Sequence, residues 1–409
     1  MRRGSLPSRL LLVFKFCRRC GRQLPLVLLI ALPLSLLLVT IRRLVLIRFG
    51  EIPGRIGPMS ADLDTYVTLK KKRNPGQVKS LDIFCLPPKH PPFNRSLLGA
   101  FSQYLGLAPR VMVVPFLILI NEIPLMKPHR VYLNPEGYFE GELNNLVHLQ
   151  HSKIRIPESE VRKFKEKLPF DLGTKDKTVY LALRDTAYTE KLLGFDGEYA
   201  KYRNMDESQI KTIIDTLTNN NFKVVRGGNK ANPLTEVRHN DFFDYSNSTI
   251  KNDFNDLVLA SIADFCIGGD TGLHNLPLLF RKRMFLISTP SFTNKLTSPL
   301  IKLVSYCDFI DVKTKKVLNL QQLNERGVFS TTGSTDLFAL GVAVQRMDER
   351  SISKFILEVL EVESGRWEPS SESLELKSVF LDYLSPHGFK KDSLFNFPNF
   401  WAKDSKWLA

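Results

Sequence analysis

One short segment of the chain carries the residue types that bind phosphate groups, because Gly269, Asp270, Thr271 and Gly272 follow an apolar, strand-like run. Glycine lets backbone amides approach an anion closely, the threonine hydroxyl can donate to a phosphate oxygen, and a helix that begins here would add its positive end. His274, one turn into that helix, is either a ligand contact or an ordinary buried histidine. The alternative interpretation of the segment is a simple turn in which Asp270 caps the helix.

Three arginines occupy loop positions next to expected strands. Arg184 ends one strand-like run, Arg203 and Asn204 precede a helical pattern, and Arg226 ends the next strand pattern. Because parallel strands end at the same edge of a sheet, these side chains can gather at one place. A guanidinium matches two oxygens of a diphosphate and keeps its charge. The pattern therefore predicts a diphosphate site, and the alternative for each arginine is a surface ion pair with a neighbouring acidic residue.

The elements that position these residues alternate regularly from Lys175 onward. Asp206 and Gln209 form a capping-box pattern at the start of a helix whose apolar residues recur at helical spacing. Alternating strands and helices predict right-handed crossovers, a parallel sheet covered on both faces, and ligands at the carboxyl ends of its strands. The strand patterns cover residues 178–185, 222–228, 241–245, 264–270 and 283–289, and the helical patterns cover 205–221, 252–263, 271–280 and 351–363.

The part before residue 170 is an α/β pattern of lower regularity. It contains a strand pattern at 42–50, a loop rich in glycine and proline at 51–59, a helix at 62–72 capped by an aspartate, a strand at 81–88 and an apolar run at 111–123. We therefore expect an α/β fold with two Rossmann-like domains. The expected boundaries are a basic and apolar membrane-associated segment at 1–41, a first domain at 42–172, a second domain at 173–349, and a C-terminal helix and tail at 350–409.

The net charge of +15 is concentrated at the N-terminus, because residues 1–50 carry ten Lys/Arg and no acidic residue. The eighteen uncharged residues Leu24–Ile41 are barely long enough to cross a bilayer. Basic residues beside an apolar run favour an anionic membrane surface as partner and disfavour nucleic acid. The positive-inside bias favours a cytosolic N-terminus, so that a single crossing would export the body of the protein. We expect a membrane-associated protein at the cytoplasmic face. Pro25 and Pro33 suit an element that lies in one leaflet, so crossing and lying both stay open.

The five cysteines are few and irregularly spaced, which predicts reduced thiols instead of a disulfide framework. Cys17 and Cys20 have the spacing of a zinc pair, but neither a second pair nor a nearby histidine completes a site. We therefore expect no metal.

Several motifs resemble those of a bacterial family of glycosyltransferases associated with surface polysaccharide synthesis: IRFGEIPGRIGPM, ALRDTAY, YRNMDESQIKTIIDTLTNNNFKVVRGG and DYSNSTIKNDFNDLVLASIADFCIGGDTGL. The similarity runs in order from about Arg42 to Leu360. It implies the GT-B architecture, with a cleft between an acceptor domain and a nucleotide-sugar domain. The DTGLHN turn is also similar to the phosphate-binding turn of heptosyltransferases, whose histidine would stand at Asn275 instead of His274. Pro58 stands where the front motif often has histidine.

The resemblance implies transfer of a sugar from a nucleoside diphosphate to a hydroxyl of a glycan or of a lipid-linked acceptor. In this fold no metal or other cofactor is implied, because helix N-termini and cationic side chains stabilise the leaving diphosphate. We assign that role to Arg184, Thr271 and Gly272, with Arg203 as a further candidate.

A general base for the acceptor is expected in the loop after the first strand. Glu51 and Asp62 are the nearest carboxylates, and Glu51 is preferred, while Arg55 and Gly57 belong to the same acceptor loop. Asp62 and Asp64 also have the D-x-D form that carries a metal in the other major glycosyltransferase fold. They stand too early in the chain for that role.

Two other classes of protein stay open. A non-catalytic sugar- or nucleotide-binding protein of the same fold is one, because Pro58 replaces a histidine of the motif. A lumenal enzyme with one membrane crossing is the other, in which Asn94 and Asn247 would be open to glycosylation. The donor nucleotide, the sugar, the acceptor and the stereochemical outcome are left undetermined.

Overall fold

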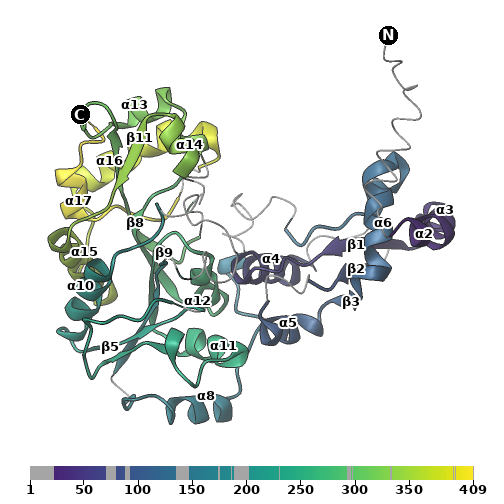
Figure 1. Cartoon of the computed structure of the whole chain (residues 1–409), viewed down its shortest axis with the longest axis horizontal. Coiled ribbons are helices and arrows are strands. Elements are labelled where there is room, and N and C mark those ends of the chain that lie inside the picture. The colour runs from purple at the N-terminus through teal and green to yellow at the C-terminus, as the bar shows by residue number, and fades with distance from the viewer. Residues whose placement is uncertain are drawn as a thin grey trace, which may run out of the picture. The chain divides into compact units, whose positions relative to one another are not determined.

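A computed structural model of the 409-residue chain provides the structure (Figure 1). It describes residues 23–70, 80–87, 93–134, 147–173, 176–185, 187, 202–229, 231–292, 296, 298–331, 334–389, 391 and 393–408. Cys17, Cys20 and the first seven basic residues lie outside this part of the chain.

The described residues form two compact units. Unit 1 is drawn from Met1–Arg55, Thr65–Phe93 and Leu98–Pro135, and unit 2 from Ile56–Asp64, Asn94–Leu97 and Glu136–Ala409. The domain boundaries expected from the sequence stay predictions.

Unit 1 is built on three parallel strands in the order β1-β2-β3. The helix α6 covers this sheet, and Phe116 of α6 stacks on Phe49 of β1 with ring centroids 4.4 Å apart. Pro115 lies inside α6. The elements are α2 (Leu24–Leu26), the π-helical turn η2 (Val27–Ala31), α3 (Leu32–Ile41), β1 (Leu46–Glu51), β2 (Ser80–Cys85), β3 (Gly106–Ala108), α6 (Arg110–Glu122) and η3 (Pro124–His129), while α4 (Ile56–Leu69) and α5 (Arg95–Ser102) contribute residues to both units.

The helix α4 begins six residues earlier than the sequence predicts. The motif expected as a loop, from Ile56 onward, forms its first turn, and Arg55 is its N-cap residue without a side-chain hydrogen bond. Pro58 fits this first turn because the amide it lacks would have no partner there. The glycine and proline content of residues 51–59 indicated a loop. Residues 56–59 are nevertheless helical, because proline is tolerated in the first turn of a helix.

Unit 2 is built on six parallel strands in the order β6-β5-β4-β7-β8-β9, as predicted for a parallel α/β sheet. Chain order reverses between β4 and β7, so this is the switch point where doubly wound sheets bind ligands. The elements are α8 (Glu158–Lys165), β4 (Lys177–Ala182), α10 (Glu207–Thr218), β5 (Phe222–Arg226), β6 (Phe242–Phe243), η5 (Tyr245–Asn247), α11 (Asp253–Ile262), β7 (Phe265–Gly268), η6 (Gly272–His274), α12 (Asn275–Leu279), β8 (Arg283–Thr289), β9 (Ile301–Tyr306), β10 (Asp308–Asp311), α13 (Leu320–Glu325), η7 (Val328–Ser330), α14 (Ser334–Ala339), β11 (Val342–Gln345), α15 (Glu349–Glu363), α16 (Ser371–Leu384), η8 (Ser385–His387) and α17 (Asn399–Asp404).

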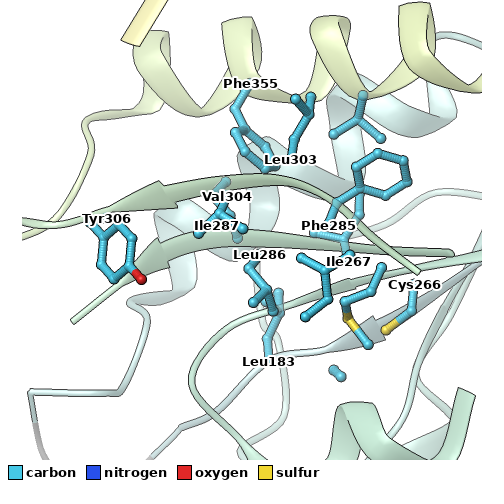
Figure 2. Packing of buried hydrophobic residues seen from close by; sticks show 14 of the residues in the cluster. Leu183, Cys266, Ile267, Phe285, Leu286, Ile287, Leu303, Val304, Tyr306 and Phe355 are labelled. Atoms are coloured by element: carbon cyan, nitrogen blue, oxygen red, sulfur yellow. The ribbon is translucent and has the colours of Figure 1, made fainter. Parts of the chain in front are cut away.

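Helices cover both faces of the six-stranded sheet. In Figure 1, α10 and α15 lie on one side of it and α11 and α12 on the other. The capping box of Asp206 and Gln209 is confirmed at the start of α10. Figure 2 shows Phe355 of α15 pointing toward Leu303 of β9, and both residues belong to the buried cluster between the sheet and its helices.

The residues that we expected as a C-terminal tail are folded and buried. They form α16 and α17, and Trp407 stacks on Phe380 of α16 with ring centroids 5.9 Å apart. Trp401 also packs into the main core. These aromatic residues bury their surface against residues far away in the sequence, which the sequence pattern alone did not indicate. The antiparallel pair β10–β11 was not anticipated.

Candidate functional site

The segment from Gly269 to Gly272, for which the sequence predicts phosphate binding, lies at the switch point of the six-stranded sheet. Gly268 ends β7 and is paired with Ala182, which ends β4. The next residue, Gly269, donates its amide hydrogen to the Ala182 carbonyl at 3.1 Å. Arg184 follows two residues after Ala182 and is half-buried. The structure therefore brings the segment and Arg184 to the same edge of the sheet.

The turn is capped by Thr271 and not by Asp270. The Thr271 hydroxyl oxygen accepts a hydrogen bond from the Leu273 amide, and the Thr271 amide donates to the Gly269 carbonyl at 2.9 Å. Among the described residues, no acceptor faces the amides of Asp270 and Gly272. The single helix expected at 271–280 is instead η6 followed by the five-residue α12. Any attraction for an anion therefore comes from these amides and nearby cations, and little comes from a helix dipole.

Gly57 lies directly against this turn. A Cβ atom at Gly57 would lie 2.6 Å from the Gly272 Cα and 2.9 Å from its carbonyl oxygen. The first turn of α4 therefore packs on the backbone of Gly272, which only glycine permits. The sequence placed Gly57 in an acceptor loop, whereas the structure places it against the turn at Gly272. Arg55, the other residue of that loop, is exposed.

Arg203 is the cation that the structure pairs with the turn. Its Nε lies 3.2 Å from Asp270 Oδ2, which also accepts a hydrogen bond from the Ser291 hydroxyl at 2.7 Å. The Arg203 guanidinium lies over the Tyr202 ring, 5.3 Å from its centroid. Asp270 and Tyr202 thus orient a half-buried arginine beside the two available amides.

Asn204 and Arg184 are connected through the backbone. The Met205 amide donates to the Arg184 carbonyl at 3.0 Å, which positions the segment from Arg203 to Met205 beside the end of β4. The Asn204 side-chain oxygen is buried without a hydrogen-bond partner among the described residues.

Arg226 does not contact solvent and serves the fold. Its side chain is 1% exposed, and its Nη2 lies 2.7 Å from Asp185. Its Nη1 donates to the Asn232 carbonyl at 2.7 Å and lies 3.5 Å from Asp244. A buried guanidinium requires such counter-charges. The side chain ties together the loops after β4, β5 and β6, and its predicted role as a donor ligand stays a prediction.

His274 is buried beside the turn, and its role as a donor ligand stays a prediction. Its Nδ1 lies 3.3 Å from the Gly269 carbonyl oxygen. Burial lowers the pKa of His274, and the nearby Asp270 carboxylate opposes this only in part. A neutral imidazole with its proton on Nδ1 donates to Gly269 and stabilises the turn.

The D-x-D residues do not form a metal pair. Asp64 is bound by Arg281, whose Nη1 lies 2.7 Å from Asp64 Oδ2, and Asp62 lies half-buried within α4 instead of in a loop. Within the described residues, no group of three or more His, Cys, Asp or Glu side chains could hold a metal ion.

Glu51 ends β1 at the carboxyl edge of the sheet in unit 1, and its side chain is 46% exposed. Arg130 Nη2 lies 3.2 Å from Glu51 Oε2, and Arg110 Nη2 lies 3.6 Å from Oε1. Sequence reasoning missed both arginines. Arg110 was recoverable in principle, because it opens a helix directly after a short strand, whereas Arg130 follows a turn that has no clear pattern.

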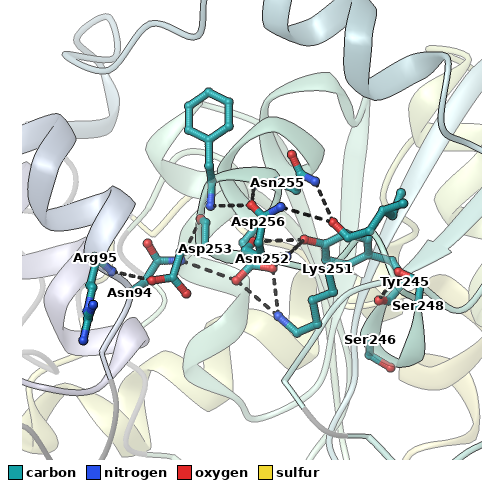
Figure 3. Close-up of polar contacts among 12 residues, drawn as sticks. Asn94, Arg95, Tyr245, Ser246, Ser248, Lys251, Asn252, Asp253, Asn255 and Asp256 are labelled. Carbon is teal, nitrogen blue, oxygen red and sulfur yellow. Dashed lines mark hydrogen bonds and ion pairs between the residues drawn. The ribbon is translucent and has the colours of Figure 1, made fainter.

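A polar network fixes one of the two candidate glycosylation sites (Figure 3). Asn94 is 5% exposed, accepts a hydrogen bond from the Leu97 amide at 2.7 Å, and donates to the Asp253 carbonyl at 2.9 Å. Asp253 also accepts from the Arg95 amide at 2.7 Å. Asn94 is therefore closed to glycosylation in the folded chain, and Asn247 is exposed.

No family model and no curated protein matches the chain. Among solved structures, ADP-heptose LPS heptosyltransferase II of E. coli is similar at a TM-score of 0.33 and 12% identity, over 59% of this chain and 84% of that chain. This likeness is too distant to support an argument about activity.

Proposed function

We propose that the protein is a glycosyltransferase of GT-B type, which transfers a sugar from a nucleoside diphosphate to a hydroxyl of a glycan or a lipid-linked acceptor. The observation that supports it most is the switch-point site, where the Asp270 and Gly272 amides form no hydrogen bond within the described residues, Arg203 pairs with Asp270, and Arg184 stands at the same edge of the sheet. A pyrophosphate matches this combination of backbone donors and guanidinium groups. The glycosyl group in the proposal comes from the motif resemblance alone.

In the proposed reaction, a bond forms between the acceptor oxygen and the anomeric carbon while the bond from that carbon to the diphosphate breaks. The Asp270 and Gly272 amides, Arg203 and Arg184 stabilise the charge that develops on the diphosphate. Glu51 accepts the proton of the acceptor hydroxyl. The proposal needs no metal, because amides and guanidinium groups supply the positive charge.

Binding of nucleoside diphosphates tests the site. The purified protein is titrated with UDP, GDP, ADP and CMP while its melting temperature is followed, since a ligand of the folded state raises it. We expect one diphosphate to stabilise the protein and Arg203→Gln to weaken its binding about tenfold or more.

Arg283→Gln is the matched control, because Arg283 also pairs with a carboxylate, Glu363 at 2.8 Å, but stands at the amino end of β8. Equal loss of affinity in both variants, or no stabilisation by any of the nucleotides, would contradict the proposal.

A non-catalytic nucleotide-binding protein is the second candidate. Pro58 favours it, because the position where the front motif often has histidine is occupied by a residue without a titratable group. Product formation from a bound nucleoside diphosphate sugar separates the two candidates. The cytoplasmic face stays a prediction in both.

A further inference from the structure

The apolar helix, which we define as Leu24–Ile41, buries only one stripe of its surface. Val27, Ala31, Ser35 and Leu38 recur every three or four residues and are buried. The remaining positions carry no charge, and the stretch has a mean hydropathy of 2.7. The large exposed side chains are Leu28, Leu29, Ile30, Leu34, Leu36 and Leu37.

Both halves of the apolar helix pack on unit 1. Val27 and Ala31 contact Leu119 of α6. Leu38 joins the cluster that contains Phe49 of β1 and Leu117 of α6. Figure 1 shows α2 and α3 beside α6. The helix is therefore attached along its length to the same body that carries the sheet.

This attachment conflicts with a membrane crossing. Eighteen helical residues span about 27 Å, roughly the hydrocarbon thickness of a bilayer. A crossing would bring α6 into the hydrocarbon along with the apolar helix, and α6 begins with Arg110 and ends with Glu122. The neighbouring strand β1 carries Arg48, which is bound to Asp82 at 2.6 Å. Charged groups and sheet edges are costly in lipid.

A helix that is apolar all round is normally covered on every side. Within the described residues, protein covers one stripe, so the exposed leucines need another apolar partner. The flank of the helix is basic, with Arg42 and Arg43 at its end and no acidic residue in the first fifty positions. This charge matches anionic lipid headgroups. We propose that the exposed face of the apolar helix lies in one leaflet of an anionic bilayer, parallel to its surface, and attaches unit 1 there without crossing. The inference is independent of the proposed function.

Vesicle flotation of the full chain tests the surface. We expect binding to phosphatidylcholine vesicles that contain phosphatidylglycerol, and weaker binding without it. Leu29 and Leu36 are 77% and 68% exposed, so Leu29→Gln with Leu36→Gln should reduce the partition coefficient about 100-fold or more without unfolding the protein. The matched control is Leu374→Gln with Leu394→Gln, two leucines of unit 2 that are 51% and 55% exposed. Equal effects of the two pairs would overturn the proposal.

Insertion depth distinguishes lying from crossing. Nitroxide labels are placed singly at Leu29→Cys and Leu36→Cys in the full chain, with Cys17→Ser and Cys20→Ser. The two positions are seven residues apart, about 10 Å along the helix. A helix in the plane of the leaflet gives both labels the same shallow depth. A depth difference close to 10 Å would overturn the proposal. It would also be overturned by a stable dimer in which the second copy shields the labels in the absence of vesicles.

Discussion

The carboxyl edges of the two parallel sheets differ in how their charges are held. In unit 2, buried or half-buried ion pairs connect the loops: Arg226 with Asp185 and Asp244, and Arg203 with Asp270. In unit 1, Glu51 ends β1 and pairs with Arg110 and Arg130, but nearly half of its side chain is exposed. An edge with paired charges and fixed amides suits a rigid diphosphate, because preorganised donors need no rearrangement on binding. An exposed carboxylate suits a general base that must reach the hydroxyl groups of varied or bulky acceptors.

Loss of Arg226 should have the largest effect on the edge of unit 2. Arg226→Met leaves Asp185 and Asp244 without their shared counter-charge, so we expect the free energy of unfolding to fall by about 3–5 kcal/mol. Urea unfolding followed by circular dichroism measures it. The exposed pair of Lys391 and Asp382 is the control, and Lys391→Met should cost about 0.5 kcal/mol or less. Similar losses in both variants would mean that the edge of unit 2 is no more organised than the surface.

Loss of Glu51 should affect turnover alone. Glu51→Gln is expected to lower the transfer rate by about 100-fold or more, because a general base contributes that much. Nucleoside diphosphate affinity should stay unchanged, and unfolding should change little, because glutamine keeps an oxygen that can accept the hydrogen bond from Arg130. Asp62→Asn, in the middle of α4, is the comparison variant and should have a smaller effect. If transfer persists unchanged in both variants, neither carboxylate is the base.

Substitutions at two glycines of the proposed diphosphate site distinguish a loss of packing from a loss of diphosphate binding. Gly57→Ala forces a Cβ against the Gly272 backbone and should cost about 1–3 kcal/mol of stability. At Gly269 a Cβ would meet no atom within 4 Å, so Gly269→Ala should leave stability within about 0.5 kcal/mol. It should still weaken nucleoside diphosphate binding if the anion approaches that backbone. Unchanged affinity in a stable Gly269→Ala protein would place the anion elsewhere.

A smaller, pH-dependent effect comes from His148 in unit 2. Burial, and to a lesser extent Arg281, lowers the pKa of His148 to about 3 from 6.5. Below pH 6.5 the unfolded chain binds a proton that the folded histidine does not, so stability present above pH 6.5 is lost as the pH falls toward 3. Between pH 7 and pH 5.5 we expect a loss of about 1 kcal/mol. Unfolding at the two pH values should show it, and His148→Gln should remove it. His151→Gln, at an exposed histidine, should not.

Several features followed from the sequence because they depend on neighbouring residues. The strands of unit 2 are apolar runs, and the capping box of Asp206 and Gln209 is a pattern four residues long. The segment from Gly269 to Gly272 indicated a turn after a strand, and that turn is present. Local periodicity and turn chemistry were therefore sufficient for the strands β4 to β8 and for the helices α10, α11 and α15, and they placed the candidate diphosphate segment after β7.

Other features were decided only by contacts between distant parts of the chain. Arg226 could not be told from a ligand arginine, because its burial depends on Asp185 and Asp244 in other loops. Gly57 reads as a loop glycine until Gly272 is packed against it. The apolar helix reads as a possible membrane crossing until α6 covers one of its stripes. A sequence determines which residues are apolar, charged or conformationally free. Which of them are buried or paired depends on contacts between residues that are far apart in the sequence, and only the tertiary structure contains those contacts.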